Sequence, residues 1–182
     1  MEDLIEKNYI LAELYIGDED INKNIRIINS HEEFIRTNYP SFFEEMIKTD
    51  EHKNNEEEIK QTQIRINGEL IPFSYFHQFK RKGNYTIKYS FKHYLTKTNQ
   101  MFNNCDYFTK IDLSNFNAEK VNIAHCMFSC KSLKYLDLSC FNNKNVDFRG
   151  IVGGCISLKY ENVITNNKFL LYYVKSSLNS LI

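Results

Sequence analysis

Three cysteines and one histidine in the middle of the chain are residues of the types that bind metal ions. Cys126 and Cys130 are four residues apart, His125 precedes the first of them, and Cys105 lies upstream. This spacing falls within the loose range of one half of a zinc site. A complete site needs a second closely spaced pair of ligands, which the sequence lacks. We therefore expect no metal ion and no other cofactor, and we interpret these cysteines as core residues.

Catalysis has little support in the residue pattern. His125 beside a cysteine lacks a third residue to orient it and a recognisable oxyanion hole. The chain has 6 glycines and no glycine-rich phosphate-binding loop. Asp112 and Asp137 occupy equivalent positions in two similar stretches, which would bring them about 5 Å apart on adjacent strands. We interpret them as exposed members of a repeated polar column, and we predict that the protein is not an enzyme.

A basic segment at residues 76–97, FHQFKRKGNYTIKYSFKHYLTK, interleaves lysine and arginine with aromatic residues. Nucleic-acid grooves show this pattern, because cations contact phosphates while aromatic rings stack on bases. Alternation along a strand explains it equally well, with the aromatic residues in the core and the basic residues outside. Nucleic-acid binding through this segment is therefore the alternative function.

The elements that position these residues are predicted by an internal repeat. YFTKIDLSNFN at 107–117 resembles KYLDLSCFNNK at 134–144, and Cys105, Cys130 and Cys155 follow one another at steps of 25 residues. IKYS at 87–90 precedes the two clear copies, and ENVI at 161–164 follows them as a degraded copy. A period of this length with an LxxLxLS pattern is typical of leucine-rich-repeat solenoids.

Within each copy, strand alternation separates inward from outward residues. In FTKIDLS, we expect Phe108, Ile111 and Leu113 to point into the core, while Lys110 and Asp112 face outward. We expect equivalent strands to stack in parallel, so that Tyr135 and Tyr160 lie side by side. The cysteine column would then run through the interior, where free cysteine is common.

The stretches MFNNCDYFTKIDLSNFNAEKV and MFSCKSLKYLDLSCFNNKNV look like the 25-residue repeats of BspA-like leucine-rich-repeat surface proteins. The resemblance covers about residues 86–163. It implies a solenoid fold and a role in adhesion or protein binding.

Local signals predict the flanking elements. YILAELYI at 9–16 and IRIIN at 25–29 are typical of strands, Ser30 is placed to cap a helix ending near Asn38, and a second helix begins at Pro40 or Ser41. Residues 49–58 are predicted to form an exposed loop. Asn67-Gly68 favours a hairpin that pairs 62–66 with 69–73. Near the C-terminus, apolar residues on one face predict a helix capped by Asn166 or Asn167.

These elements give a mixed α/β fold class with three parts. Residues 1–85 form an α+β N-terminal cap, residues 86–163 form a short leucine-rich-repeat-like solenoid, and residues 164–182 form a C-terminal capping helix. With 42% hydrophobic residues, the chain has enough apolar side chains for a buried core.

Charge and hydropathy indicate where in the cell the protein is located. The formal net charge is zero, although acidic residues dominate 1–60 and basic residues dominate 61–182. The beginning of the sequence lacks the basic and apolar regions of a signal peptide, and no apolar run is long enough to span a membrane. We expect a cytoplasmic protein without a membrane partner.

We therefore predict a non-catalytic protein-protein interaction module whose partner is a protein or peptide rather than nucleic acid. Tyrosines and charged residues on a rigid sheet suit protein recognition, because aromatic residues carry much of the binding energy at interfaces. The predicted binding residues are the outward positions of the repeat strands: Lys88, Lys110, Asp112, Tyr135, Asp137, Tyr160 and Asn162.

Overall fold

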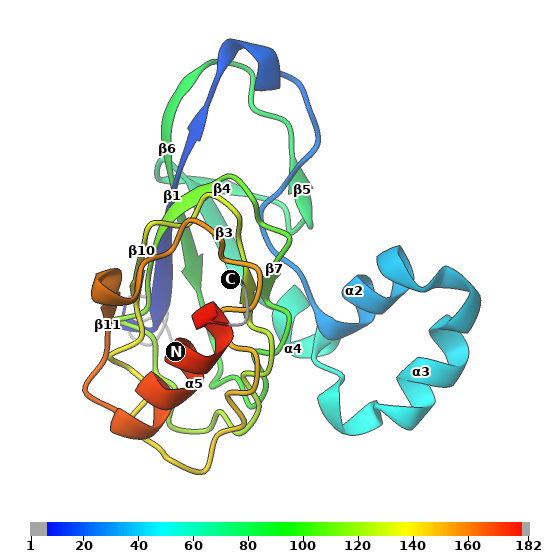
Figure 1. The fold of residues 1–182 in the computed structure, drawn as a ribbon. Helices are drawn as coiled ribbons and strands as arrows, with labels where there is room; N and C mark the ends of the chain where they lie inside the picture. The colour runs from blue at the N-terminus through cyan, green and yellow to red at the C-terminus, as the bar shows by residue number, and fades with distance from the viewer. Residues whose placement is uncertain (1–6, 180–182) are drawn as a thin grey trace.

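The computed structural model describes residues 7–179, and its main feature is a seven-stranded mixed sheet (Figure 1). The strand order is β11-β10-β8-β1-β6-β3-β4. The strands are β1 (Tyr9–Ile16), β3 (Gln63–Ile66), β4 (Glu69–Ile71), β6 (Gly83–Ser90), β8 (Phe108–Asp112), β10 (Tyr135–Asp137) and β11 (Val163–Ile164).

The first strand of the chain lies at the centre of this sheet. β1 pairs antiparallel with β6 on one side and with β8 on the other. Its alternate residues Ile10, Ala12, Leu14 and Ile16 are buried, because successive side chains of a strand point to opposite faces. The strand predicted from YILAELYI is thus confirmed, and it joins the two halves of the chain.

The parallel part of the sheet comes from the repeats. β8 and β10 pair in parallel with Ile111 opposite Leu136, which confirms the 25-residue register of the two clear copies. The degraded copy pairs differently, because Leu136 lies opposite Val163 rather than Glu161. Residues Tyr160–Asn162 form a short 3-10 helix, η4, and this helix delays the strand by two residues.

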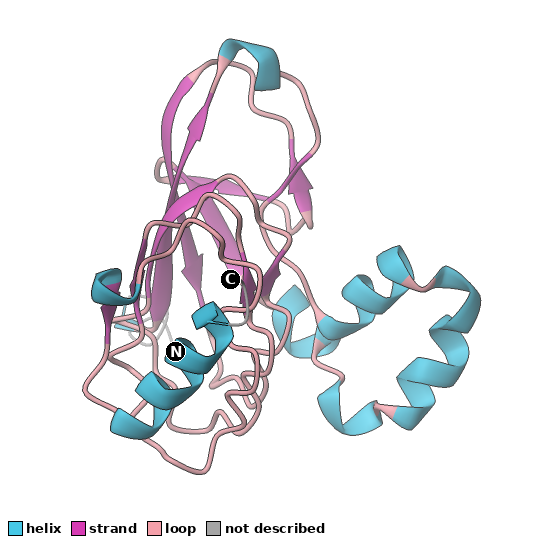
Figure 2. Cartoon of the chain, in the orientation of Figure 1, coloured by secondary structure: helices cyan, strands magenta, loops and turns pink. Residues whose placement is uncertain are grey.

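A second layer faces the sheet and is mostly loop, as Figure 2 shows. The short strands β7 (Phe102–Asn103) and β9 (Phe128–Ser129) pair in parallel within it. Isolated bridges join Lys97 to Ile123 and Ile123 to Asp147, again between equivalent parts of successive repeats. Each repeat therefore contributes one strand to the sheet and one loop segment to the facing layer.

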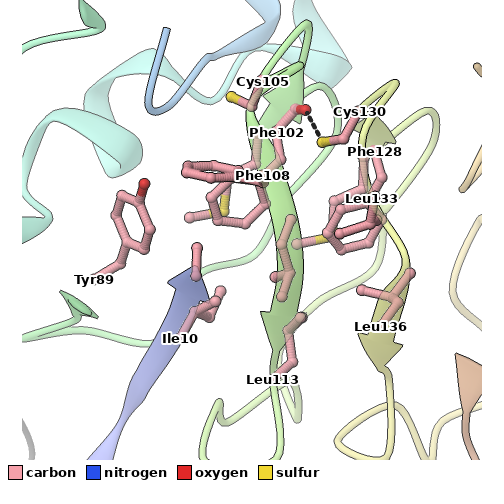
Figure 3. Packing of buried hydrophobic residues seen from close by; sticks show 14 of the residues in the cluster. Ile10, Tyr89, Phe102, Cys105, Phe108, Leu113, Phe128, Cys130, Leu133 and Leu136 are labelled. Carbon is pink, nitrogen blue, oxygen red and sulfur yellow. Dashed lines mark hydrogen bonds between the residues drawn. The ribbon is translucent and has the colours of Figure 1, made fainter. Parts of the chain in front are cut away.

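The core lies between these two layers (Figure 3). Phe102 and Phe128 stack with their ring centroids 5.8 Å apart, and Phe102 also meets Phe108 edge-on. Cys130 Sγ donates a hydrogen bond to the carbonyl oxygen of Phe102 at 3.1 Å. The buried positions of Cys105, Cys130 and Cys155 confirm that the cysteine column runs through the interior.

The predicted solenoid is wrong. A solenoid stacks its strands in one parallel ladder, whereas here the parallel strands β8, β10 and β11 continue through antiparallel β1 into β6, β3 and β4. IKYS does not stack on IDLS, because β1 lies between β6 and β8. The physical reason is the small size of the repeat region. Three strands of two to five residues leave an unpaired edge, which the long N-terminal strand covers.

A helical arm is inserted between the strands of the N-terminal half, and Figure 1 shows α2 and α3 projecting from the body. It contains α2 (His31–Asn38), η2 (Pro40–Phe42), α3 (Phe43–Thr49), η3 (Glu51–Lys53) and α4 (Glu56–Lys60). The Ser30 hydroxyl accepts a hydrogen bond from the Glu33 amide at 3.1 Å, which confirms the predicted cap. The predicted loop at 49–58 is wrong, since η3 and the start of α4 lie there.

The remaining elements are short apart from the last helix. β2 (Ile25–Arg26) pairs with β5 (Phe76–His77), and η1 (Asp18–Asp20) follows β1. The predicted hairpin is confirmed in β3 and β4, with positive φ angles at Asn67 and Gly68. α5 (Lys168–Asn179) buries Leu170 and Val174. No helix among residues 7–179 combines the length and apolar character needed to cross a membrane.

Candidate interaction surface

The sheet has a second side, facing away from the core, which we call the outer face. On β1 the outer face carries Tyr9, Leu11, Glu13 and Tyr15, which alternate with the buried residues. Tyr15 is 54% exposed. An antiparallel sheet commonly has one open side while the other side covers the core, and β1, β6, β3 and β4 pair antiparallel.

One row of side chains crosses all seven strands on the outer face, and we call it the charged row. Strand registers place these residues next to one another in the order Ile164, Asp137, Asp112, Leu11, Lys88, Arg65 and Leu70. The two carboxylates lie on one side of β1 and the two cations lie on the other. The apolar residues are at the centre and at both ends, where Ile164 is 43% and Leu70 is 52% exposed.

A second row lies beside the charged row. Lys110 Nζ contacts Glu13 Oε1 at 3.0 Å, across the pairing of β8 with β1. This hydrogen bond raises the pKa of Lys110. The same ammonium lies 5.5 Å from the centroid of the Tyr135 ring, which is within the range of a cation–π contact. These contacts hold Lys110 and Tyr135 in place.

The charged residues of the charged row have only local partners. Lys88 Nζ lies 4.1 Å from the centroid of the Tyr9 ring. Asp112 and Asp137 each accept a hydrogen bond from the amide two residues later, at 2.9 and 2.8 Å. Among residues 7–179, no ion pair involves Lys88, Arg65 or either aspartate. The charges of Lys88, Arg65 and Asp112, which are half-buried, are therefore available to a partner. The Asp137 carboxylate is nearly buried.

The structure brings five of the predicted binding residues together on the outer face: Lys88, Lys110, Asp112, Tyr135 and Asp137. It does not bring Tyr160 and Asn162 into the rows, because both lie in η4. The prediction that Tyr135 and Tyr160 lie side by side on stacked strands is therefore wrong. Asp137 was predicted to be exposed, yet it is only 9% exposed.

Sequence reasoning missed other outer-face residues, which come from strands that were assigned to a separate N-terminal cap. They are Leu11, Glu13, Tyr15, Arg65 and Leu70. The alternation in YILAELYI predicted which of its residues share a face, but not that this face is continuous with that of the repeats.

The basic segment 76–97 does not form one continuous groove. Phe79, Tyr89 and Phe91 are buried in the core, so their rings do not face solvent. Lys82 Nζ pairs with Asp18 Oδ2 at 3.0 Å, close to the acidic residues of η1. Lys88 lies apart from Lys82, on the outer face.

Histidines gather where the helical arm meets the repeat loops. His31 Nε2 lies 3.9 Å from Asp50 Oδ2, and His125 Nδ1 lies 4.0 Å from Asp147 Oδ2. Burial lowers the pKa of His31 to about 4 and also lowers that of His125. Both ring nitrogens of His31 are buried without a hydrogen-bond partner. Both imidazoles are therefore neutral near pH 7.

Cys126, beside His125, does not join the other cysteines. Cys105 and Cys130 lie in the core, whereas Cys126 is half-buried, and burial raises the pKa of its thiol. A raised thiol pKa disfavours the reactive thiolate. Within residues 7–179, no three His, Cys, Asp or Glu side chains are grouped in a way that could hold a metal ion.

No protein-family model, curated protein or solved structure matches this chain with significant similarity. The resemblance to BspA-like repeats therefore rests on the repeat motifs alone.

Proposed function

We propose that this chain is a non-catalytic protein-interaction module that binds a protein partner through the outer face of its sheet. The observation that carries this proposal is the charged row, in which Asp112, Lys88 and Arg65 are half-buried and have no ion-pair partner. The row ends at the exposed apolar residues Ile164 and Leu70. Interfaces between proteins combine apolar contact with complementary charges in this way.

The mixed charge favours a protein over nucleic acid. A phosphate backbone is bound by a surface of one sign, and Asp112 and Asp137 would repel it. The basic residues of 76–97 lie partly on the outer face and partly beside the acids of η1. Adhesion and protein binding by BspA-like proteins, which share the repeat motif, give this proposal further support.

The cytoplasm remains our proposed location. All five cysteines are free thiols, and free thiols persist in reducing compartments. The buried cysteine column fills the core without cross-links, so it needs no oxidising environment.

The experiment compares a tagged wild-type chain with a Leu11→Glu variant. Both are used to capture proteins from the native cell, and the captured proteins are quantified by mass spectrometry. Leu11 lies at the centre of the charged row, so a third carboxylate there should remove the specific partner. The control is Phe42→Glu, which makes the same kind of change on the exposed part of the helical arm, where Phe42 is 60% exposed.

Equal capture by the wild type and Leu11→Glu would contradict the proposal. Loss of a partner from Phe42→Glu alone would move the binding surface to the helical arm. Nuclease treatment during capture tests the alternative function, because a partner held through nucleic acid is released by it.

A further inference from the structure

We propose that the outer face binds the outer face of a second copy of this chain in a homodimer. The two-fold axis of this homodimer runs parallel to β1, midway between the two facing sheets. This inference rests on the proposed function, since it names the partner of the same surface. It is carried by the order of residues in the charged row, which is antisymmetric about its centre.

The antisymmetry holds at every pair of positions equally distant from β1. Asp112 and Lys88 flank Leu11 in the adjacent strands. Asp137 and Arg65 come next on the two sides. Ile164 and Leu70 end the row. Each carboxylate therefore has a cation at the mirror position, and each apolar end has an apolar counterpart.

A two-fold axis parallel to β1 brings the mirror positions of the charged row together. When two sheets face each other about that axis, each residue meets the residue at the mirror position in the other copy. Asp112 would meet Lys88, and Leu11 would meet itself. Arg65 would lie over Asp137, which is only 9% exposed, so the pairing of Asp112 with Lys88 carries the charge complementarity. An axis across the strands would instead place acids on acids and cations on cations. The charges thus select one orientation, in which the same patch serves both subunits.

Asp112 and Lys88 do not pair with each other within one chain, because Lys88 packs on the Tyr9 ring instead. Asp112 and Lys88 are separated by β1, which puts their strands roughly 9.6 Å apart at a spacing of about 4.8 Å per strand. Leu11 occupies the position between them. A facing copy brings Asp112 opposite Lys88 twice per dimer, so dimer formation supplies ion pairs that the single chain lacks.

The outer residues of β1 are compatible with this axis. Tyr9, Leu11 and Tyr15 would meet their own equivalents and give aromatic and apolar contacts close to the axis. The two Glu13 side chains would also approach each other, but each is already paired with Lys110 at 3.0 Å. The strands of the two sheets would run nearly in line, as in aligned sheet packing.

The test exchanges charges at mirror positions and measures molecular mass by light scattering and sedimentation. The wild-type chain should be a dimer that weakens as salt increases. Lys88→Glu places a carboxylate opposite Asp112, and Asp112→Lys places a cation opposite Lys88. Because the dimer is symmetric, each of these repulsive contacts occurs twice. Each variant alone should dissociate at a concentration at least about tenfold higher than the wild type.

Mixing the two variants is the decisive measurement. In a mixed dimer every exchanged charge faces its opposite, so Lys88→Glu and Asp112→Lys together should restore association. The control Lys175→Glu makes the same charge change on an exposed lysine of α5 and should leave the dimer unchanged. Circular dichroism checks that each variant is folded.

A second measurement does not depend on the fold of Asp112→Lys. Leu11→Cys should be linked to its equivalent by a bismaleimide of about 10 Å, the usual distance between packed sheets. Leu70→Cys should give no linked dimer, because six strand spacings, or roughly 29 Å, separate the two equivalents. Linking at position 70 but not at position 11 would overturn the proposed axis.

A wild-type chain that is monomeric, or a mixture that fails to associate, overturns the homodimer. If Leu11→Glu still loses a captured partner, the outer face binds a different protein and the proposed function stands. If capture is also unchanged, both proposals fail.

Discussion

Leu136 and Asp137 are neighbours whose side chains lie on opposite sides of β10, so they test the strand register residue by residue. Leu136 is fully buried between Ile111 and Val163, and Leu136→Ala should lower the free energy of unfolding by about 2–5 kcal/mol. Asp137→Ala should cost about 1 kcal/mol, because the Ser139 amide loses its hydrogen bond. Urea unfolding measures both. Equal losses would contradict the register.

The cysteines give a second prediction at this scale. Cys105, Cys130 and Cys155 are buried, and burial raises the pKa of the Cys105 and Cys130 thiols. These three should react with a thiol reagent only after unfolding, since the reagent needs an accessible thiolate. Titration of the native protein should detect at most the half-buried Cys126 and Cys140, whereas denatured protein should show all five. Fast reaction of a native core cysteine would argue against the packing described.

Single residues could be assigned to a face wherever a strand alternates regularly. Ile111 and Lys110 were placed correctly because KIDL alternates and its equivalent copy pairs in register. Tyr160 was misplaced because η4 shifts the last copy by two residues. That short helix has no periodic signal, so the sequence does not indicate the shift.

At the scale of elements, the sequence left two adjacent asparagines as candidates for the N-cap of α5, and the structure shows that Asn167 is the cap. Asn167 Oδ1 accepts hydrogen bonds from the amides of Phe169 and Leu170, and its Nδ2 donates to the carbonyl oxygen of Phe141. Asn167→Ala should cost about 1–2 kcal/mol of unfolding free energy. Asn166→Ala is the matched control and should change it little. A larger loss from Asn166→Ala would show that the helix is capped differently.

The junction of the helical arm should respond to pH. Burial depresses the pKa of His31 to about 4 from its ordinary 6.5, so the folded chain binds a proton less readily than the unfolded chain. Stability from neutral His31 is therefore complete above about pH 6.5, and it decreases as pH falls from 6.5 towards 4. The loss is as much as about 3 kcal/mol.

Unfolding measured from pH 7.5 to 4 checks this expectation. His31→Gln should flatten the pH dependence, whereas His52→Gln changes an exposed histidine and should preserve it. An unchanged pH profile in His31→Gln would assign the effect to other groups, such as His125.

Elements with local chemical signals could be predicted, and those held by distant contacts could not. Ser30 capped its helix as predicted, and Asn67-Gly68 formed its hairpin. The polar composition of residues 49–58 led to the prediction of an exposed loop. Asn55 is nevertheless buried, because its side chain bonds to the His31 amide and to the Asn99 carbonyl oxygen. Partners so far away in sequence leave no local pattern.

At the scale of the whole molecule, the repeat predicted neighbouring strands but not the sheet that contains them. The pairing of β8 with β10 follows from similarity between two stretches of sequence. The insertion of β1 between β6 and β8 depends on two unrelated strand edges accepting one long apolar strand. Nothing in YILAELYI indicates which edges those are. The part of the outer face contributed by the two clear copies was therefore predictable. The parts contributed by the degraded copy, β1 and β3 were not.

The central place of β1 also affects how the chain is made. Glu13 and its partner Lys110 are 97 residues apart, so at about 5–20 residues per second the ribosome needs roughly 5–20 s to synthesise both neighbours of β1. Until residues 83–90 are made, the first strand has two unpaired edges, and until residues 108–112 are made it keeps one. Unpaired edges beside an apolar side promote aggregation. The most vulnerable period of biosynthesis is thus set by the arrival of residues 83–112, well before translation ends.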